Sequence, residues 1–171
     1  MSWLRRILGR SDTNGGRKSG APQRAHKAGA GPVYGHGDVP LEPAKAQLLD
    51  LLRERGARSA VIVYEGGQDE GWMTSFEYSA VALGADPADW SGESLAEPQA
   101  VDIDGAIEMA GGPDDALFGA AEAVMCDKWG TFAGSFEVEG RLVIDVDAGR
   151  IVRRDSVSVE GARAKTEIEV I

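Results

Sequence analysis

Phe132 to Val159 reads FAGSFEVEGRLVIDVDAGRIVRRDSVSV, and this stretch decides the fold. Apolar and polar side chains alternate along it, which predicts strands with one buried face and one solvated face. The apolar members of the alternation are Phe136, Val138, Leu142, Ile144 and Val146. Turns are expected at Glu139-Gly140 and at Asp147-Ala148-Gly149, because glycine adopts positive φ without steric cost. The stretch therefore predicts an antiparallel β meander of three runs.

Further strands are expected on both sides of the meander in the sequence. Residues 58–64 are continuously apolar, which is typical of a central strand covered on both faces. Residues 72–83 alternate, and a short strand is expected near residues 99–103. The side chains expected on one face of the strand at 72–83 are Trp72, Thr74, Phe76 and Tyr78. Residues 165–171 alternate again and carry charge, as edge strands often do.

Two segments have the apolar spacing of amphipathic helices. Residues 40–55 carry a leucine stripe on one side and stop at Gly56. Residues 113–129 begin with Pro113, which suits the first helical turn, and stop at Gly130. We therefore expect an α+β fold: an antiparallel sheet of five or six strands that ends in the β meander, with both helices packed on one face.

The N-terminal region has a different composition from the rest of the chain. Residues 1–9 have the pattern of a short amphipathic helix, whose apolar side chains are Trp3, Leu4, Ile7 and Leu8. Residues 10–38 are rich in glycine and basic residues and are expected to be a disordered linker, so that residues 39–171 form a single α+β domain. Nine residues are too few for a stable helix alone, so this segment should dock on a partner protein, on a membrane surface or on its own domain.

Charge is distributed unevenly along the chain. Residues 1–28 contain seven basic residues and one acidic residue, a net charge of +6, whereas the whole chain carries −10, which leaves −16 for residues 29–171. An acidic domain of this kind disfavours nucleic acid as a partner. One cysteine excludes an internal disulfide and fits a reducing compartment, and no apolar run approaches the length of a membrane span. The sequence thus indicates a cytoplasmic protein.

The residue types exclude several kinds of catalysis. No histidine follows residue 36, and Cys126 is the single cysteine, so neither a nucleophile–histidine arrangement nor a zinc cage can be built in the domain. No phosphate-binding glycine motif is present. We therefore expect no catalytic residue, no cofactor and no metal ligand. Carboxylate pairs remain, and a solvated acidic face is the simplest interpretation of them, ahead of a cation site or a catalytic pair.

Candidate contact residues gather at one end of the predicted sheet. An acidic glycine-containing loop is expected at residues 65–71, directly before a tryptophan, and another tryptophan ends the second helix. Large aromatic residues at the ends of elements are common at interaction surfaces, although each one could also cap the core. The candidate residues of the domain are Glu65, Asp69, Glu70, Trp72 and Trp129.

The pattern Tyr64-x-Gly66-Gly67-x-Asp69-x-Gly71, followed by a helix and a β meander, resembles a family of small acidic bacterial proteins known as a domain of unknown function. The resemblance covers roughly residues 57–160. The family's Gly-Asp-Ser-Gly loop is replaced here by residues 68–71, and its Gly-Trp-Glu segment by residues 127–130. The resemblance implies an α+β domain of bacterial or phage origin, and it implies no activity.

These observations favour a non-enzymatic bacterial accessory or regulatory protein that binds another protein. The first alternative is an acidic mimic, or an immunity-type inhibitor, that occupies a basic cleft. The second alternative is a hydrolase that uses carboxylates and a divalent cation.

Overall fold

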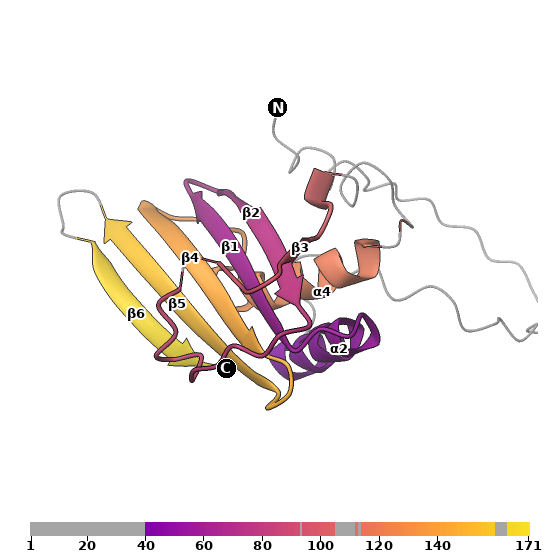
Figure 1. Ribbon diagram of the computed structural model, residues 1–171. Helices are drawn as coiled ribbons and strands as arrows, with labels where there is room; N and C mark the ends of the chain where they lie inside the picture. The colour runs from indigo at the N-terminus through magenta and orange to yellow at the C-terminus, as the bar shows by residue number, and fades with distance from the viewer. Residues whose placement is uncertain (1–39, 93, 105–111, 113, 160–163) are drawn as a thin grey trace, which may run out of the picture. The chain divides into compact units, whose positions relative to one another are not determined.

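The alternation of residues 132–159 builds two long strands of a six-stranded antiparallel sheet (Figure 1). The computed structural model describes residues 40–171 except 93, 105–111, 113 and 160–163. In the order in which they lie side by side, the strands are β3 (Gln99–Ala100), β2 (Glu70–Ser79), β1 (Ser59–Gly67), β4 (Phe136–Asp145), β5 (Arg150–Val159) and β6 (Lys165–Val170). The helix expected at residues 1–9 and the linker expected at residues 10–38 lie outside the described residues.

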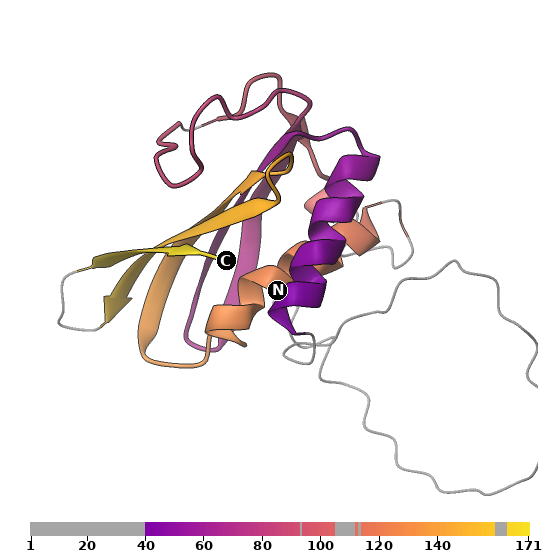
Figure 2. The ribbon, with the colours of Figure 1, turned by 90° about the horizontal axis from the view of Figure 1, so that it is seen from below.

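Both helices, α2 (Leu41–Glu54) and α4 (Asp115–Trp129), pack on one face of the sheet, as predicted (Figures 1 and 2). Their apolar stripes meet the inward side chains of the strands in one core. Its fully buried members include Leu48, Leu52, Ile62, Leu117, Val124, Leu142 and Ile144. Each large aliphatic side chain buried in this way contributes roughly 1.5–3 kcal/mol. We call this side of the sheet the helix face and the opposite side the loop face.

The loop face is covered at one end by the segment between β2 and β3 (Figure 2). A second apolar cluster forms there from Val61, Trp90, Leu95 and Val143. Arg141 of β4 lies over the Trp90 ring and donates to the carbonyl of Gly92 at 3.2 Å, and Arg154 of β5 donates to the carbonyl of Ala88. This cover confirms that β1 is buried on both faces near its start, as its continuous apolar run predicts.

A β-bulge at Thr74 changes which side chains of β2 share a face. The register of β1 against β2 shifts between Val63 and Tyr64, which leaves Thr74 without a cross-strand partner. Beyond the bulge the alternation is reversed, so Met73 is buried in the core and Trp72 is 41% exposed on the loop face. The prediction that Trp72 shares a face with the other aromatic residues of β2 is therefore wrong, because it assumed an uninterrupted ladder.

Glu139-Gly140 does not form a turn, which contradicts the prediction of three runs. β4 continues through Gly140, which pairs with Tyr64 on one side and with Asp155 on the other. A Cβ at residue 140 would overlap the Tyr64 ring, so the glycine provides space rather than a turn. The second predicted turn is confirmed: Gly149, with φ of 64°, lies between β4 and β5.

Candidate functional site

The β1–β2 hairpin ends in a two-residue turn rather than in the predicted acidic loop at residues 65–71. Gly66 pairs with Gly71 in the ladder, and only Gln68 and Asp69 lie between the strands. Both turn residues have positive φ, 55° and 70°. Such turns match the twist of the flanking strands but usually contain asparagine and glycine, so this turn is strained.

Phe132 holds the hairpin in place. Its ring packs against Gly66 and Gly71, and a Cβ at either glycine would overlap it. The backbone N–H of Asp69 donates to the Phe132 carbonyl at 3.1 Å, and the Phe132 side chain is fully buried. The hairpin is thus fixed relative to the segment that leads from α4 into β4, and its side chains project from a defined position.

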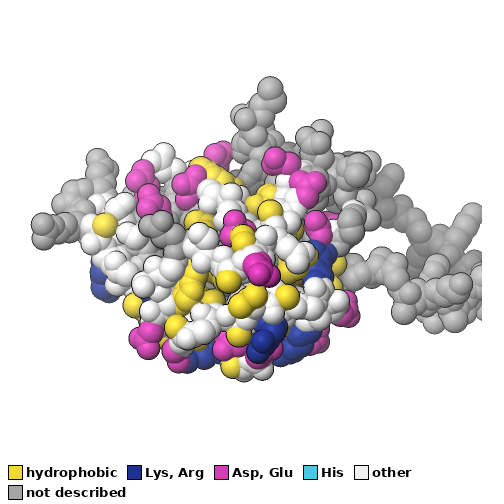
Figure 3. All heavy atoms as spheres, in the orientation of Figure 1, with side chains coloured by type: hydrophobic (Ala, Val, Ile, Leu, Met, Phe, Trp, Pro, Cys, Tyr) yellow, Lys and Arg dark blue, Asp and Glu magenta, His cyan; other side chains and the backbone are white. Residues whose placement is uncertain are grey.

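Near the hairpin turn, a row of side chains crosses the loop face from β2 through β1 to β4. Trp72 of β2 pairs with Glu65 of β1, which pairs with Glu139 of β4. In the next row, Gly67 of β1 lies between Glu70 of β2 and Glu137 of β4. Figure 3 shows acidic side chains along the upper part of this face, and basic and acidic ones together along its lower part. We call Glu65, Glu70, Trp72, Glu137 and Glu139 the carboxylate–Trp72 surface.

No basic residue in the described part of the chain forms an ion pair with the four glutamates of this surface. The arginines nearest along the strands, Arg141 and Arg154, donate instead to backbone carbonyls of the segment between β2 and β3. Glu65 and Glu139 lie directly opposite each other on neighbouring strands, an arrangement of like charges that destabilises a sheet. The surface is therefore unfavourable for the isolated domain.

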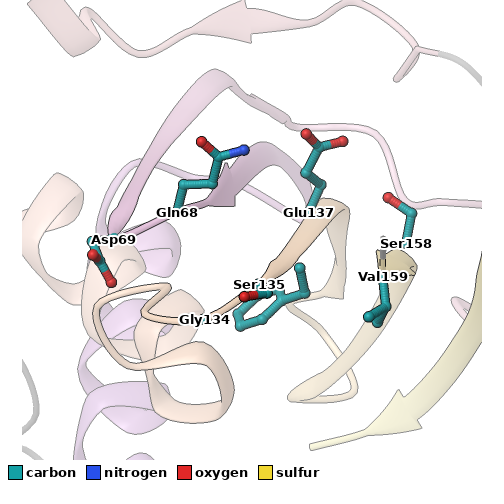
Figure 4. Close-up of a pocket in the computed structure, with 8 residues that line it drawn as sticks. Gln68, Asp69, Gly134, Ser135, Glu137, Ser158 and Val159 are labelled. Carbon is teal, nitrogen blue, oxygen red and sulfur yellow. The ribbon is translucent and has the colours of Figure 1, made fainter. Parts of the chain in front are cut away.

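Two adjoining clefts lie at this end of the sheet and share Gln68 and Glu137. The first, of about 520 Å³, lies over the carboxylate–Trp72 surface. The second, of about 670 Å³, lies between the hairpin turn and the ends of β4 and β5 (Figure 4). It is lined by carboxylate, amide, hydroxyl and apolar groups from Gln68, Asp69, Gly134, Ser135, Phe136, Glu137, Ser158 and Val159. Both clefts are open to solvent and acidic.

The structure brings four of the predicted contact residues together at these clefts: Glu65, Asp69, Glu70 and Trp72. Trp129 is engaged inside the domain instead, since its indole N–H donates to Asp155 at 3.1 Å and its ring lies 5.3 Å from that of Phe136. Trp3, Leu4, Ile7 and Leu8 lie outside the described residues. Glu137 and Glu139 form one of the carboxylate pairs that the sequence predicts as a solvated acidic face, because the sequence does not show that β4 lies beside β1.

A buried polar network, which the sequence alone does not predict, lies on the helix face. The Asp155 carboxylate, 1% exposed, accepts hydrogen bonds from the Tyr64 hydroxyl at 2.5 Å, the Lys128 ammonium at 3.1 Å and the Trp129 indole. Burial and the hydrogen bond to Asp155 raise the pKa of Tyr64 far above its usual range. The site is closed to solvent, and its donors hold α4 against β5.

The same network continues to the edge of the sheet. Arg153, fully buried, donates to the Val124 carbonyl at 2.6 Å and to Glu169 at 3.3 Å, while Lys128 also donates to Glu167 at 3.0 Å. Burial alone would lower the pKa of Lys128, but hydrogen bonds to Glu167 and Asp155 raise it above its ordinary value. Hydrogen bonds from two lysines lower the pKa of Glu167. On this face every carboxylate of β5 and β6 has a cationic partner.

Among the residues that the structure describes, no group of three or more histidine, cysteine, aspartate or glutamate side chains is arranged to hold a metal ion. In the same part of the chain, no helix combines the length and the apolar character that a membrane span requires. Comparisons with protein families, with curated proteins and with solved structures find no match to this chain.

Proposed function

We propose that this protein is a non-enzymatic accessory or regulatory protein of a bacterial cytoplasm that binds another protein through the carboxylate–Trp72 surface. The observation that supports this proposal is the contrast between the two faces of the sheet. On the helix face, Asp155, Glu167 and Glu169 all have cationic partners. On the loop face, four glutamates and an exposed tryptophan have none within the described chain. Lysine or arginine side chains of a partner would provide the cationic partners that these glutamates and Trp72 do not have within the described chain.

The surface has the chemistry to bind a segment rich in lysine or arginine. The face of Trp72 can receive a cationic side chain, an interaction worth roughly 0.5–2 kcal/mol. The glutamates on both sides of it can bind further cations and accelerate association by electrostatic attraction. Binding would also relieve the repulsion between Glu65 and Glu139, so that a feature unfavourable for the free domain becomes favourable in the complex.

The test is capture of partners from extract of the host, followed by calorimetric titration of the captured partner with purified variants. Glu65→Gln, Glu137→Gln and Glu139→Gln together should weaken binding at least about tenfold, which is about 1.4 kcal/mol. The control combines Glu42→Gln, Glu54→Gln and Asp104→Asn, which removes the same charge from exposed positions outside the surface. Equal weakening by both sets would reject the assignment, because net charge alone would then explain binding.

The high acidity of the domain also favours the second candidate, an acidic mimic or immunity-type inhibitor that occupies a basic cleft. Salt distinguishes the two, because a complex held mainly by charge weakens steeply as ionic strength rises from about 0.05 to about 0.5 M. A partner retained at high salt supports the accessory protein that also uses Trp72. A partner lost at high salt, and displaced by nucleic acid, supports the mimic. The described residues offer no metal site that would support the third alternative, a cation-dependent hydrolase.

The N-terminal segment has its own test within this proposal. If residues 2–9 dock on a partner or on a membrane surface, Leu4→Asp with Leu8→Asp should abolish that association and leave the thermal stability of the domain unchanged. A chain that starts at Asp38 should likewise lose the association and keep the thermal stability of the domain. Anionic and neutral lipid vesicles separate the two kinds of partner, since a basic amphipathic helix binds anionic lipid more tightly. Loss of domain stability would instead mean that the segment packs on its own core.

A further inference from the structure

Strand β6 lies at one edge of the sheet. Within the described chain it pairs with β5 alone, and the Ile171 N–H donates to the Ile151 carbonyl at 3.0 Å. Backbone groups of successive residues in an antiparallel ladder point alternately toward and away from the partner strand. The N–H and C=O groups of Thr166, Ile168 and Val170 therefore point away from β5, along a side where the described chain provides no neighbouring strand.

The β3 edge of the sheet is protected, whereas the described chain leaves the β6 edge uncovered. At the β3 edge, β3 covers two residues of β2, and the bulge at Thr74 interrupts the remainder of that strand. Strand β6 has six residues in regular register with β5, with neither bulge nor proline. Its loop-face side chains Ile168 and Val170 are each 57% exposed. Regular backbone and exposed aliphatic side chains are what a further strand requires.

The glutamates of β6 do not repel such a strand as edge charges usually do. They lie on the helix face, where Lys128 is bonded to Glu167 at 3.0 Å and Arg153 to Glu169 at 3.3 Å. Lys165 adds a third cation, 3.0 Å from Glu167. This edge is thus locally balanced in charge on a chain whose net charge is −10. An acidic copy of the same chain can approach here without strong repulsion.

We propose that β6 pairs antiparallel with β6 of a second copy of this chain, about a two-fold axis at Glu167. Side chains on one face must lie opposite each other, which limits the registers. The register centred on Glu167 places Lys165 opposite Glu169 twice and Glu167 opposite its own copy once, and each Glu167 retains its two lysine partners. A register centred on Ile168 would instead place Glu167 opposite Glu169 twice, without adding a cation. Of these two registers the charges favour the first, which has two opposite-charge pairs against one pair of like charges and makes the two Ile168 side chains diagonal neighbours.

The dimer is expected to be weak, because one pair of strand edges buries less surface than a standard interface. We expect a Kd on the order of 10–100 µM. Sedimentation of the full chain from roughly 5 to 500 µM should show a shift from monomer to dimer. Thr166→Pro removes an outward N–H without breaking the ladder to β5. Ile168→Lys adds charge to the edge. Each should raise the Kd at least about tenfold.

The control is Val81→Lys, which changes an exposed aliphatic residue away from β6 and should alter the Kd less than about twofold. Circular dichroism establishes that each variant is folded, and if Thr166→Pro is not, Ile168→Lys provides the test. A chain that stays monomeric across the concentration range would overturn the proposal. So would a dimer that both edge variants leave unchanged, since another surface would then form it.

Disulfide cross-linking tests the register. In a Cys126→Ser background, Glu167→Cys should form a disulfide-linked dimer under mild oxidation, because residue 167 lies opposite its own copy in the proposed register. Ile168→Cys should cross-link much more slowly. Faster cross-linking through residue 168 would reject the axis at Glu167.

Discussion

The Tyr64 hydroxyl donates a 2.5 Å hydrogen bond to the Asp155 carboxylate across an intervening strand. Tyr64, Gly140 and Asp155 form one row across β1, β4 and β5, and the tyrosine ring lies over the glycine to reach the aspartate. Lys128 and Trp129 of α4 bind the same carboxylate from above the sheet. Since a buried carboxylate needs all of its donors, this row defines one position of α4 on the sheet.

Gly140→Ala should destabilise the domain strongly. The added methyl group would overlap the Tyr64 ring, so the ring must move and its hydrogen bond to Asp155 must lengthen or break. Overpacking of a core costs roughly 1–3 kcal/mol, and loss of a hydrogen bond to a charged group adds a similar amount. Urea denaturation should show the midpoint falling accordingly. Gly119→Ala is the matched control, because nothing lies within 4 Å of the added atom in α4, and it should stabilise the helix by roughly 0.5–1 kcal/mol.

Tyr64→Phe should remove part of the alkaline sensitivity of folding. The pKa of Tyr64 is raised in the folded state, so its contribution to stability is complete below about pH 10 and is lost as pH rises beyond that value. The variant should lose about 2 kcal/mol near neutral pH, and the difference from wild type should shrink above pH 10. Absorbance at 295 nm supplies an independent measurement. Ionisation of Tyr64 in the folded protein near pH 10 would contradict the buried hydrogen bond.

Most of the architecture could be predicted from the sequence, because spacing alone determines which side chains face a core. The turn at Gly149, the double burial of β1 and the two helices follow from it. The bulge at Thr74 could not be predicted, since threonine is an ordinary strand residue and the reversal depends on the partner strand. The predicted turn at Gly140 is wrong because a glycine in such a pattern fits either a turn or the close approach of another group, here the Tyr64 ring.

The candidate surface was only partly predictable, for a related reason. Glu65, Glu70 and Trp72 are neighbours along the chain, whereas Glu139 reaches them only because β4 pairs with β1. The network around Asp155 did leave a signal: Arg153 and Asp155 fall between Ile151 and Val157 in the inward phase of β5. Polar residues at the inward-facing positions of a strand indicate that hydrogen-bonding partners are buried with them, but the sequence does not identify those partners.

Glu122→Gln should change how stability depends on pH. Burial in α4 raises the pKa of Glu122 to about 7, above its ordinary value of 4.5. A raised pKa means that stability from this group is complete below about pH 4.5 and is lost as pH rises to about 7. The variant should therefore be more stable than wild type at pH 8, by on the order of 2 kcal/mol, with little difference at pH 4. Glu42→Gln, at an exposed position of α2, controls for removal of a charge. An equal change in stability for Glu122→Gln at pH 4 and at pH 8 would contradict the raised pKa of Glu122.

Cys126 should be inert toward thiol reagents while the domain is folded. Burial raises the pKa of this thiol to about 12, and the nearby Glu122 adds to the effect, although Arg153 opposes it. Because the thiolate is the reactive form, labelling by a disulfide reagent at pH 8 should be roughly 10³-fold slower than in denaturant. The rate should follow opening of the domain, so Gly140→Ala should accelerate labelling and Gly119→Ala should not. Labelling of the native protein at the rate of a free thiol would show that α4 does not pack on the sheet at this position.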